Sequence, residues 1–223
     1  RFEMETDRLI RYMEQRAGCN TCLAFFDGSL VVTFADTFDE RTRSHYIACA
    51  VDLFRASEKY RVPLVAYIDT SYASDLILML QRLFELPEAP SLNDAPLLWK
   101  LMQWGDRTPL FRCRRSGILA DYPAEVRDRI AFSYLKTHDG PPVRLELPTW
   151  IYEAGLHEKV LNWVRSEVII GGGYPYVIET ADQTAVLKTE DRQTFFRLLQ
   201  DWADKEALNL RLSRKMVSKV RRR

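Results

Sequence analysis

The chain has 223 residues, of which 47% are hydrophobic and 12% aromatic, so it can bury one sizeable core or two small ones without disulfides or metals. Its 32 Lys and Arg residues balance 31 Asp and Glu residues, so the net charge does not indicate a polyanion partner and only the distribution of charge can. No apolar stretch approaches the roughly 18 residues of a membrane span, and we expect no signal peptide.

The first third of the chain alternates helical and strand patterns. A charged helix is predicted over residues 1–17, a strand over 23–34, a helix over about 40–59 and a buried strand over 62–68. A strand, a helix and a strand in this order favour a parallel pair joined by a crossover. The predicted fold class is therefore α/β.

The rest of the chain continues the alternation, and we find no internal repeat. The predicted elements are a helix from Ser74 to Leu86, a proline-rich loop over 87–96, a helix near 96–104, a strand over 109–113, a hairpin of strands 130–136 and 143–147, a helix over 153–168 ended by glycines 171–173, a helix or strand over 176–187, and a helix over about 190–207. One α/β domain is the simplest interpretation.

Asp27 is the most informative residue, because it lies inside the apolar run from Leu23 to Val32. A bare carboxylate is costly to bury unless a cation or a hydrogen-bond donor compensates it. Gly28 allows a close approach of backbone or ligand, and Ser29 adds a hydroxyl. This pattern is typical of a metal-binding carboxylate, although a cap, a turn or a surface ion pair is the common alternative.

Any catalytic metal is expected to be bound by oxygen, as magnesium and manganese are, because the three histidines fall at no ligand spacing. The acids at the ends of predicted elements are the candidates: Asp27, Asp69, Asp182, and Glu3 or Glu5. The four cysteines, at positions 19, 22, 49 and 113, are interpreted as reduced thiols of a cytoplasmic protein. Cys19 and Cys22 have the spacing of a zinc or redox pair, but no second pair follows at a matching distance.

The end of the chain is basic. From residue 210 onward it carries seven positive charges and no acid, at Arg211, Arg214, Lys215, Lys219, Arg221, Arg222 and Arg223. Such a cluster is expected where a protein contacts a phosphate backbone, and a solvated tail is the alternative.

Taken together, these segments resemble the NurA family of DNA-repair nucleases, especially its bacterial branch. The resemblance extends over about 190 residues and rests on segments 26–30 (FDGSL), 105–111 (GDRTPLF), 143–150 (VRLELPTW), 172–176 (GGYPY), 178–182 (IETAD), Ala185-Val186 and Asp191-Arg192. It implies an RNase H-like mixed sheet flanked by helices. It also implies a manganese-dependent DNA nuclease, with magnesium as the alternative metal, that has 5′ to 3′ exonuclease and single-strand endonuclease activity and works as a dimer on the hexameric HerA translocase in DNA end resection.

The resemblance also implies roles for individual residues. Asp27 matches an acid of the family's second DGS-type motif and would bind metal, and Glu3 or Glu5 lies in a segment like the acidic helix that precedes it. Tyr174 matches a tyrosine near the active site, and Arg107 lies in a basic motif that would face DNA.

Two departures from the family pattern bear on the site. Asp182 stands where the family usually has histidine, and aspartate also ligates manganese. The family's first aspartate motif is expected upstream of Arg1, so residues 1–223 are interpreted as a single NurA-type domain without its N-terminal strand. Asp69, where some members have lysine, is a substitute ligand or a cap for the helix after Ser71 and Ser74.

Two other function classes compete. A NurA-like module without a working metal site would dock a translocase or DNA, and the departures above favour it. A small-molecule metal hydrolase would need a closed pocket, whereas the arginine clusters suggest an extended polyanion.

Overall fold

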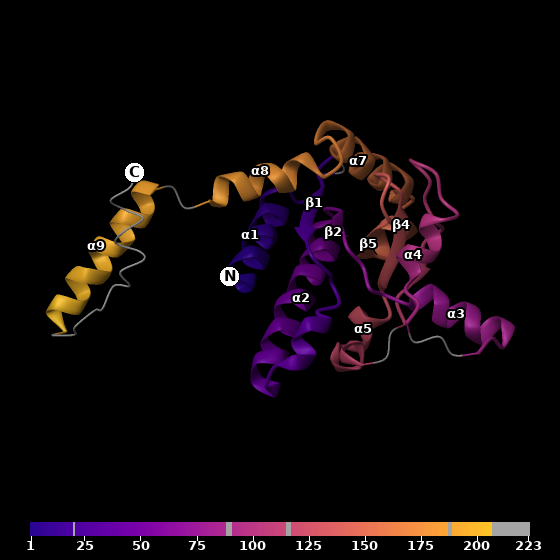
Figure 1. The fold of residues 1–223 in the computed structure, drawn as a ribbon, viewed down its shortest axis with the longest axis horizontal. Coiled ribbons are helices and arrows are strands. Elements are labelled where there is room, and N and C mark those ends of the chain that lie inside the picture. Colours follow the sequence, from indigo (N-terminus) through magenta and orange to yellow (C-terminus); the bar gives the residue numbers. More distant parts are fainter. Residues whose placement is uncertain (20, 88–90, 115–116, 187–188, 207–223) are drawn as a thin grey trace. The chain divides into compact units, whose positions relative to one another are not determined.

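The computed structural model describes residues 1–19, 21–87, 91–114, 117–186 and 189–206. The chain forms two compact units, residues 1–179 and residues 180–223. All strands of the sheet lie in the first unit (Figure 1).

The first unit is organised around one five-stranded mixed sheet. Its strands lie in the order β1 (Ala24–Asp27), β2 (Leu64–Ile68), β5 (Val143–Pro148), β4 (Ile130–Leu135) and β3 (Phe111–Arg112). Strands β1 and β2 are parallel and joined through α2 (Glu40–Tyr60), whereas every other pair is antiparallel. This α/β architecture, an open sheet flanked by helices, confirms the predicted class and is compatible with an RNase H-like fold.

Helices cover both faces of the sheet, which explains why the central strands are almost continuously apolar. The further elements of the first unit are α1 (Phe2–Gln15), η1 (Thr33–Thr37), α3 (Asp75–Phe84), α4 (Asp94–Trp99), η2 (Ile118–Asp121), α5 (Ala124–Arg127), α6 (Trp150–Glu153), α7 (His157–Ile170) and the start of α8 (Tyr176–Ala185). One core contains Met13 of α1 and Phe54 of α2, and the other contains Val160 and Val164 of α7. The sheet lies between these two cores.

Several predicted boundaries are wrong for local reasons. The strand predicted over 23–34 ends at Asp27, because Gly28 has φ +143° and the chain turns there, although Leu30–Val32 remain buried. The helix predicted over 153–168 divides into α6 and α7 around Gly155, which has φ +69°. The helix predicted near 96–104 is α4, which begins two residues earlier and ends at Trp99.

The cysteine prediction is wrong for one pair. Cys19 and Cys22 form a disulfide in the turn between α1 and β1, where their Cα atoms lie 5.5 Å apart, within the range for such a bond. Cys49 and Cys113 are buried thiols, as expected for small apolar side chains.

The second unit contains the end of α8 and the amphipathic helix α9 (Thr189–Lys205). Among the described residues of the whole chain, no helix has the length and apolar character needed to cross a bilayer.

Candidate active site at the end of strand β1

Asp27 is the last residue of β1 and is exposed, on the face of the sheet where its register partner Tyr67 lies. The hydroxyl of Tyr174, from the segment between α7 and α8, donates a hydrogen bond to Asp27 Oδ1 at 3.2 Å. The Tyr174 ring packs edge-on against Tyr67, with 5.3 Å between ring centroids. The structure thus brings together two predicted site residues, Asp27 and Tyr174, that are 147 positions apart.

The tyrosines beside Asp27 are held in their neutral form. Burial raises the pKa of Tyr174, and the nearby carboxylates of Asp27 and Asp69 raise it further. Burial also raises the pKa of Tyr67, to which Asp69 again contributes. Tyr174 therefore remains a hydrogen-bond donor toward Asp27 at neutral pH. Because the charge of Asp69 acts on both tyrosines, Asp69 belongs to the same neighbourhood.

Asp69 directly follows β2 and is exposed, so Asp27 and Asp69 stand at the carboxyl ends of two adjacent parallel strands. The cap of α3 is a different acid. The backbone amides of Leu76 and Ile77 donate to the buried carboxylate of Asp94, each at 3.0 Å. The helix-cap interpretation of Asp69 is therefore wrong. Its carboxylate instead lies near Tyr174 and Tyr67, on which its charge acts.

The residues of this neighbourhood fit a hard divalent cation. Asp27 and Asp69 supply exposed carboxylate oxygens, and magnesium-type ions are often held by one or two carboxylates together with substrate phosphates and waters. Among the described residues, however, no group of three or more His, Cys, Asp or Glu side chains is placed to hold a metal. If a cation binds here, Asp27 and Asp69 are the two carboxylates that would hold it.

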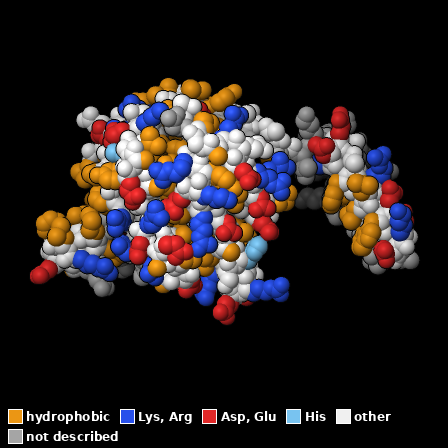
Figure 2. Space-filling view, turned by 180° about the vertical axis from the view of Figure 1, so that it is seen from behind, with side chains coloured by type: hydrophobic (Ala, Val, Ile, Leu, Met, Phe, Trp, Pro, Cys, Tyr) orange, Lys and Arg blue, Asp and Glu red, His pale blue; other side chains and the backbone are white. Residues whose placement is uncertain are grey.

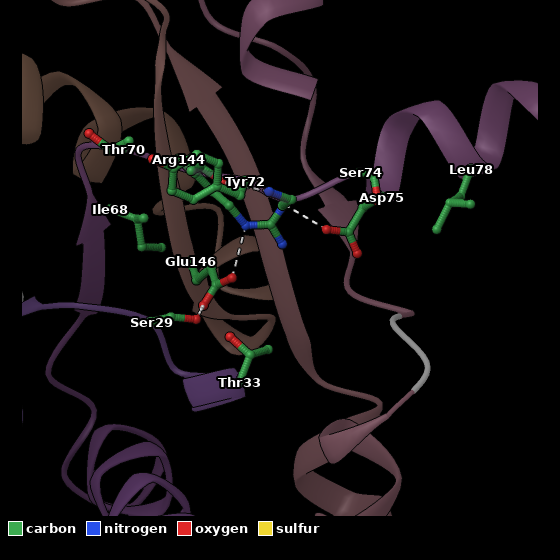
Figure 3. A pocket seen from close by; sticks show the side chains of 12 residues that line it. Ser29, Thr33, Ile68, Thr70, Tyr72, Ser74, Asp75, Leu78, Arg144 and Glu146 are labelled. Carbon is green, nitrogen blue, oxygen red and sulfur yellow. Dashed lines mark hydrogen bonds and ion pairs between the residues drawn. The ribbon is translucent and has the colours of Figure 1, made fainter. Parts of the chain in front are cut away.

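The opposite face of the sheet carries a different, buried cluster of charges (Figure 3). Arg144 and Glu146 point to the same side of β5, and Arg144 Nε donates to Glu146 Oε1 at 2.9 Å. Arg144 also pairs with Asp75 of α3 at 2.9 Å and stacks on the Phe132 ring at 3.8 Å. Arg144 is 1% exposed and Glu146 is 0% exposed, so both side chains of this pair are buried.

A pocket of about 350 Å³ opens beside this cluster. Its walls carry the hydroxyls of Ser29, Thr33, Thr70, Ser71 and Ser74, together with Arg144, Glu146 and Asp75. The labelled side chains in Figure 3 come from the turn after β1 and the start of η1, from the end of β2 and the segment that follows it, from α3 and from β5. Space therefore remains next to the turn that follows Asp27.

The other predicted metal ligands are Glu3, Glu5 and Asp182. Glu3 and Glu5 lie in the first turn of α1, where Glu3 is 3.4 Å from His45 and Glu5 pairs with Arg1 at 2.7 Å. Asp182 is exposed in the part of α8 that belongs to the second unit. Their roles as ligands stay predictions.

Of the predicted DNA-binding residues, one lies within the described part of the chain and three lie outside it. Arg107 is partly exposed and is held by Glu158 and Asn162 of α7, so its guanidinium already has partners within the fold. Arg211, Arg214 and Lys215 lie outside the described residues. On the face shown in Figure 2, positive and negative side chains are interspersed over the first unit.

Sequence reasoning assigned no role to Arg144, Glu146 or Asp94. A signal for the first two was present, because opposite charges two residues apart in an otherwise apolar strand must share one face. No comparable signal marked Asp94, whose function depends on a contact with a helix that starts 19 residues earlier in the chain.

Comparison with known proteins gives one result of consequence. The family model for the NurA domain matches residues 1–187, which includes the whole sheet, Asp27, Asp69 and Tyr174. No curated protein and no solved structure matches significantly. Since the match covers well over half of the chain, the protein belongs to the NurA family.

Proposed function

We propose that this protein is a manganese-dependent DNA nuclease that acts in DNA end resection, with 5′ to 3′ exonuclease and single-strand endonuclease activity. Membership of the NurA family supports the general part, since this is a family of metal-dependent nucleases involved in DNA end processing. The observation that carries the proposal is the exposed Asp27 at a strand end, hydrogen-bonded by Tyr174 and accompanied by Asp69.

Asp27 and Asp69 would hold the metal in the proposed site. A divalent ion bound there supplies an activated water and a Lewis acid for the leaving oxygen of a phosphodiester. Asp27 is fixed in direction by the Tyr174 hydroxyl, and Tyr174 is fixed by packing on buried Tyr67. Such outer contacts orient a ligand and tune its affinity. Basic residues of the chain, with the C-terminal arginines as candidates, would bind the DNA backbone.

The test is cleavage of end-labelled linear and single-stranded DNA by the full chain in manganese, magnesium or EDTA. We expect Asp27→Ala to lose metal-dependent cleavage, because the ion loses a direct ligand. The matched control is Asp52→Ala, which removes an exposed acid from α2 and should leave cleavage unchanged. Manganese-dependent activity that persists in Asp27→Ala would exclude this assignment.

One observation favours a second candidate function, a NurA-like module that docks a translocase or DNA without cleaving it. Among the described residues, no three His, Cys, Asp or Glu side chains lie together in a group that could hold a metal ion. This candidate predicts no cleavage by wild-type protein under any metal condition. It also predicts that the chain still binds DNA or a HerA-type hexameric ATPase.

We extend the proposal to the partners that the resemblance implies, a homodimer that works with a HerA-type hexameric ATPase. Mass measurement of the protein in solution, alone and mixed with the ATPase, tests both points. A monomer that never shifts in mass would contradict them.

A further inference from the structure

The turn that follows Asp27 is held by a charged side chain from a strand two positions away in the sheet. The backbone amide of Leu30 donates to Glu146 Oε2 at 2.9 Å, and the Ser29 hydroxyl donates to the same oxygen at 2.7 Å. On the other side of the turn, the Gly28 amide donates to the Tyr67 carbonyl at 3.2 Å. The backbone on the C-terminal side of Asp27 is thus fixed by β2 and β5.

Glu146 is itself immobilised. Its second oxygen, Oε1, accepts from Arg144 Nε at 2.9 Å, and Arg144 is anchored by Asp75 and by the Phe132 ring. Figure 3 shows these interactions as a continuous chain from Asp75 through Arg144 and Glu146 to Ser29. The position of the turn is therefore set by α3 and β5 as well as by β1.

A second buried hydroxyl holds the next residues of the same segment. The Tyr122 hydroxyl donates to the Leu30 carbonyl at 2.9 Å and accepts from the Val32 amide at 3.1 Å. Beyond Gly28, the backbone groups of Leu30 and Val32 are therefore bound by side chains and not by the backbone of a neighbouring strand.

Stability alone does not explain why a glutamate holds this turn. A buried ion pair is expensive to desolvate, and well-packed apolar residues of similar volume are often as stable or more stable. The charged cluster instead fixes the orientation of the turn, because Ser29 and Leu30 both donate hydrogen bonds to one carboxylate oxygen of Glu146. The exposed acid whose direction this turn sets is Asp27.

We propose that Glu146 is a positioning residue for Asp27, and that Ser29 transmits its effect. This inference rests on the proposed metal-binding function of Asp27. Arg144 and Asp75 hold Glu146, Glu146 holds the turn through Ser29 and Leu30, and the turn aims the Asp27 carboxylate toward the side occupied by Tyr174 and Asp69. The buried cluster on one face of the sheet thus prepares the exposed site on the other.

Ser29 is the position at which to test this, since it is half-buried and its hydroxyl can be removed without leaving Glu146 unpaired. The measurement is Mn²⁺ affinity of the full chain without DNA, from the electron paramagnetic resonance signal of free Mn²⁺. We expect Ser29→Ala to bind Mn²⁺ about tenfold more weakly, as is common when an outer-shell partner is lost. Ser29→Thr keeps the hydroxyl, its methyl can enter the adjoining pocket, and its affinity should match the wild type.

The matched control is Ser133→Ala, which removes a buried hydroxyl that donates to the Thr108 carbonyl, three strands away from Asp27. We expect this variant to keep the wild-type Mn²⁺ affinity even where its melting temperature falls. Wild-type affinity in Ser29→Ala, or an equal loss in Ser133→Ala, would overturn the positioning role. Failure of the wild-type chain to bind Mn²⁺ would instead overturn the proposed function, and this inference with it.

Discussion

At the end of β1, the two faces of the sheet place an acid in opposite environments, one exposed and one buried. Asp27 is exposed, accepts a hydrogen bond from a neutral tyrosine and has Asp69 nearby. Glu146 is fully buried, and its two oxygens are engaged by Arg144, Ser29 and Leu30. Two carboxylates close together in the fold therefore differ in environment: Glu146 holds the backbone from a buried position, whereas Asp27 faces solvent, where we propose that it binds a cation.

The largest effect on stability is expected from removing the buried ion pairs of Arg144. Arg144→Met removes the cation that compensates Glu146 and Asp75, so the free energy of unfolding should fall by about 3–5 kcal/mol. Urea denaturation followed by circular dichroism measures this loss. A change below about 1 kcal/mol, the usual value of an exposed ion pair, would show that the cluster is not the buried network described above.

The next effect concerns the exposed face. Asp69→Asn removes one of the two carboxylates that would hold the metal, and cleavage by the full chain should fall by about 100-fold, which corresponds to about 2.7 kcal/mol. Its urea midpoint should stay unchanged, because Asp94 and not Asp69 caps α3. Wild-type cleavage rates in this variant would remove Asp69 from the site. Asp52→Asn serves as the matched control.

The smallest effect is a pH dependence on the buried face. Burial raises the pKa of Asp94, although the amides of Leu76 and Ile77 partly offset this. The folded state therefore keeps the Asp94 proton to a higher pH than the unfolded state does. Relative to Asp94→Asn, the wild type should be most stable below the ordinary aspartate pKa and should lose that advantage as pH rises through the raised pKa. Urea denaturation of both proteins across acidic pH measures this difference, and a difference that grows with pH would contradict it.

The sequence predicts those features of the two faces that depend on contacts between residues close together in the chain. The strand that contains Asp27 follows from the apolar run, and the hairpin of β4 and β5 follows from alternation and the turn at 139–142. The early end of β1 does not, because Leu30–Val32 are as apolar as strand residues but are buried through contacts with Glu146 and Tyr122. These partners lie 116 and 90 positions away.

The candidate site shows the same limit. The family resemblance assigns Asp27 and Tyr174 to one active site, but the hydrogen bond between them is seen only in the structure, since nothing local in the sequence links them. From the sequence, Asp69 is either a substitute metal ligand or a helix cap. Only the contact of α3 with Asp94 excludes the capping role.

We propose above that Asp27, on the exposed face, binds a divalent cation. The most direct measurement is a Mn²⁺ titration of the full chain and of Asp27→Asn, which keeps an acceptor for the Tyr174 hydroxyl and removes the charge. We expect binding by the wild type and about 100-fold weaker binding by the variant, with the same melting temperature in both. Equal Mn²⁺ affinity in the two proteins would contradict this proposal.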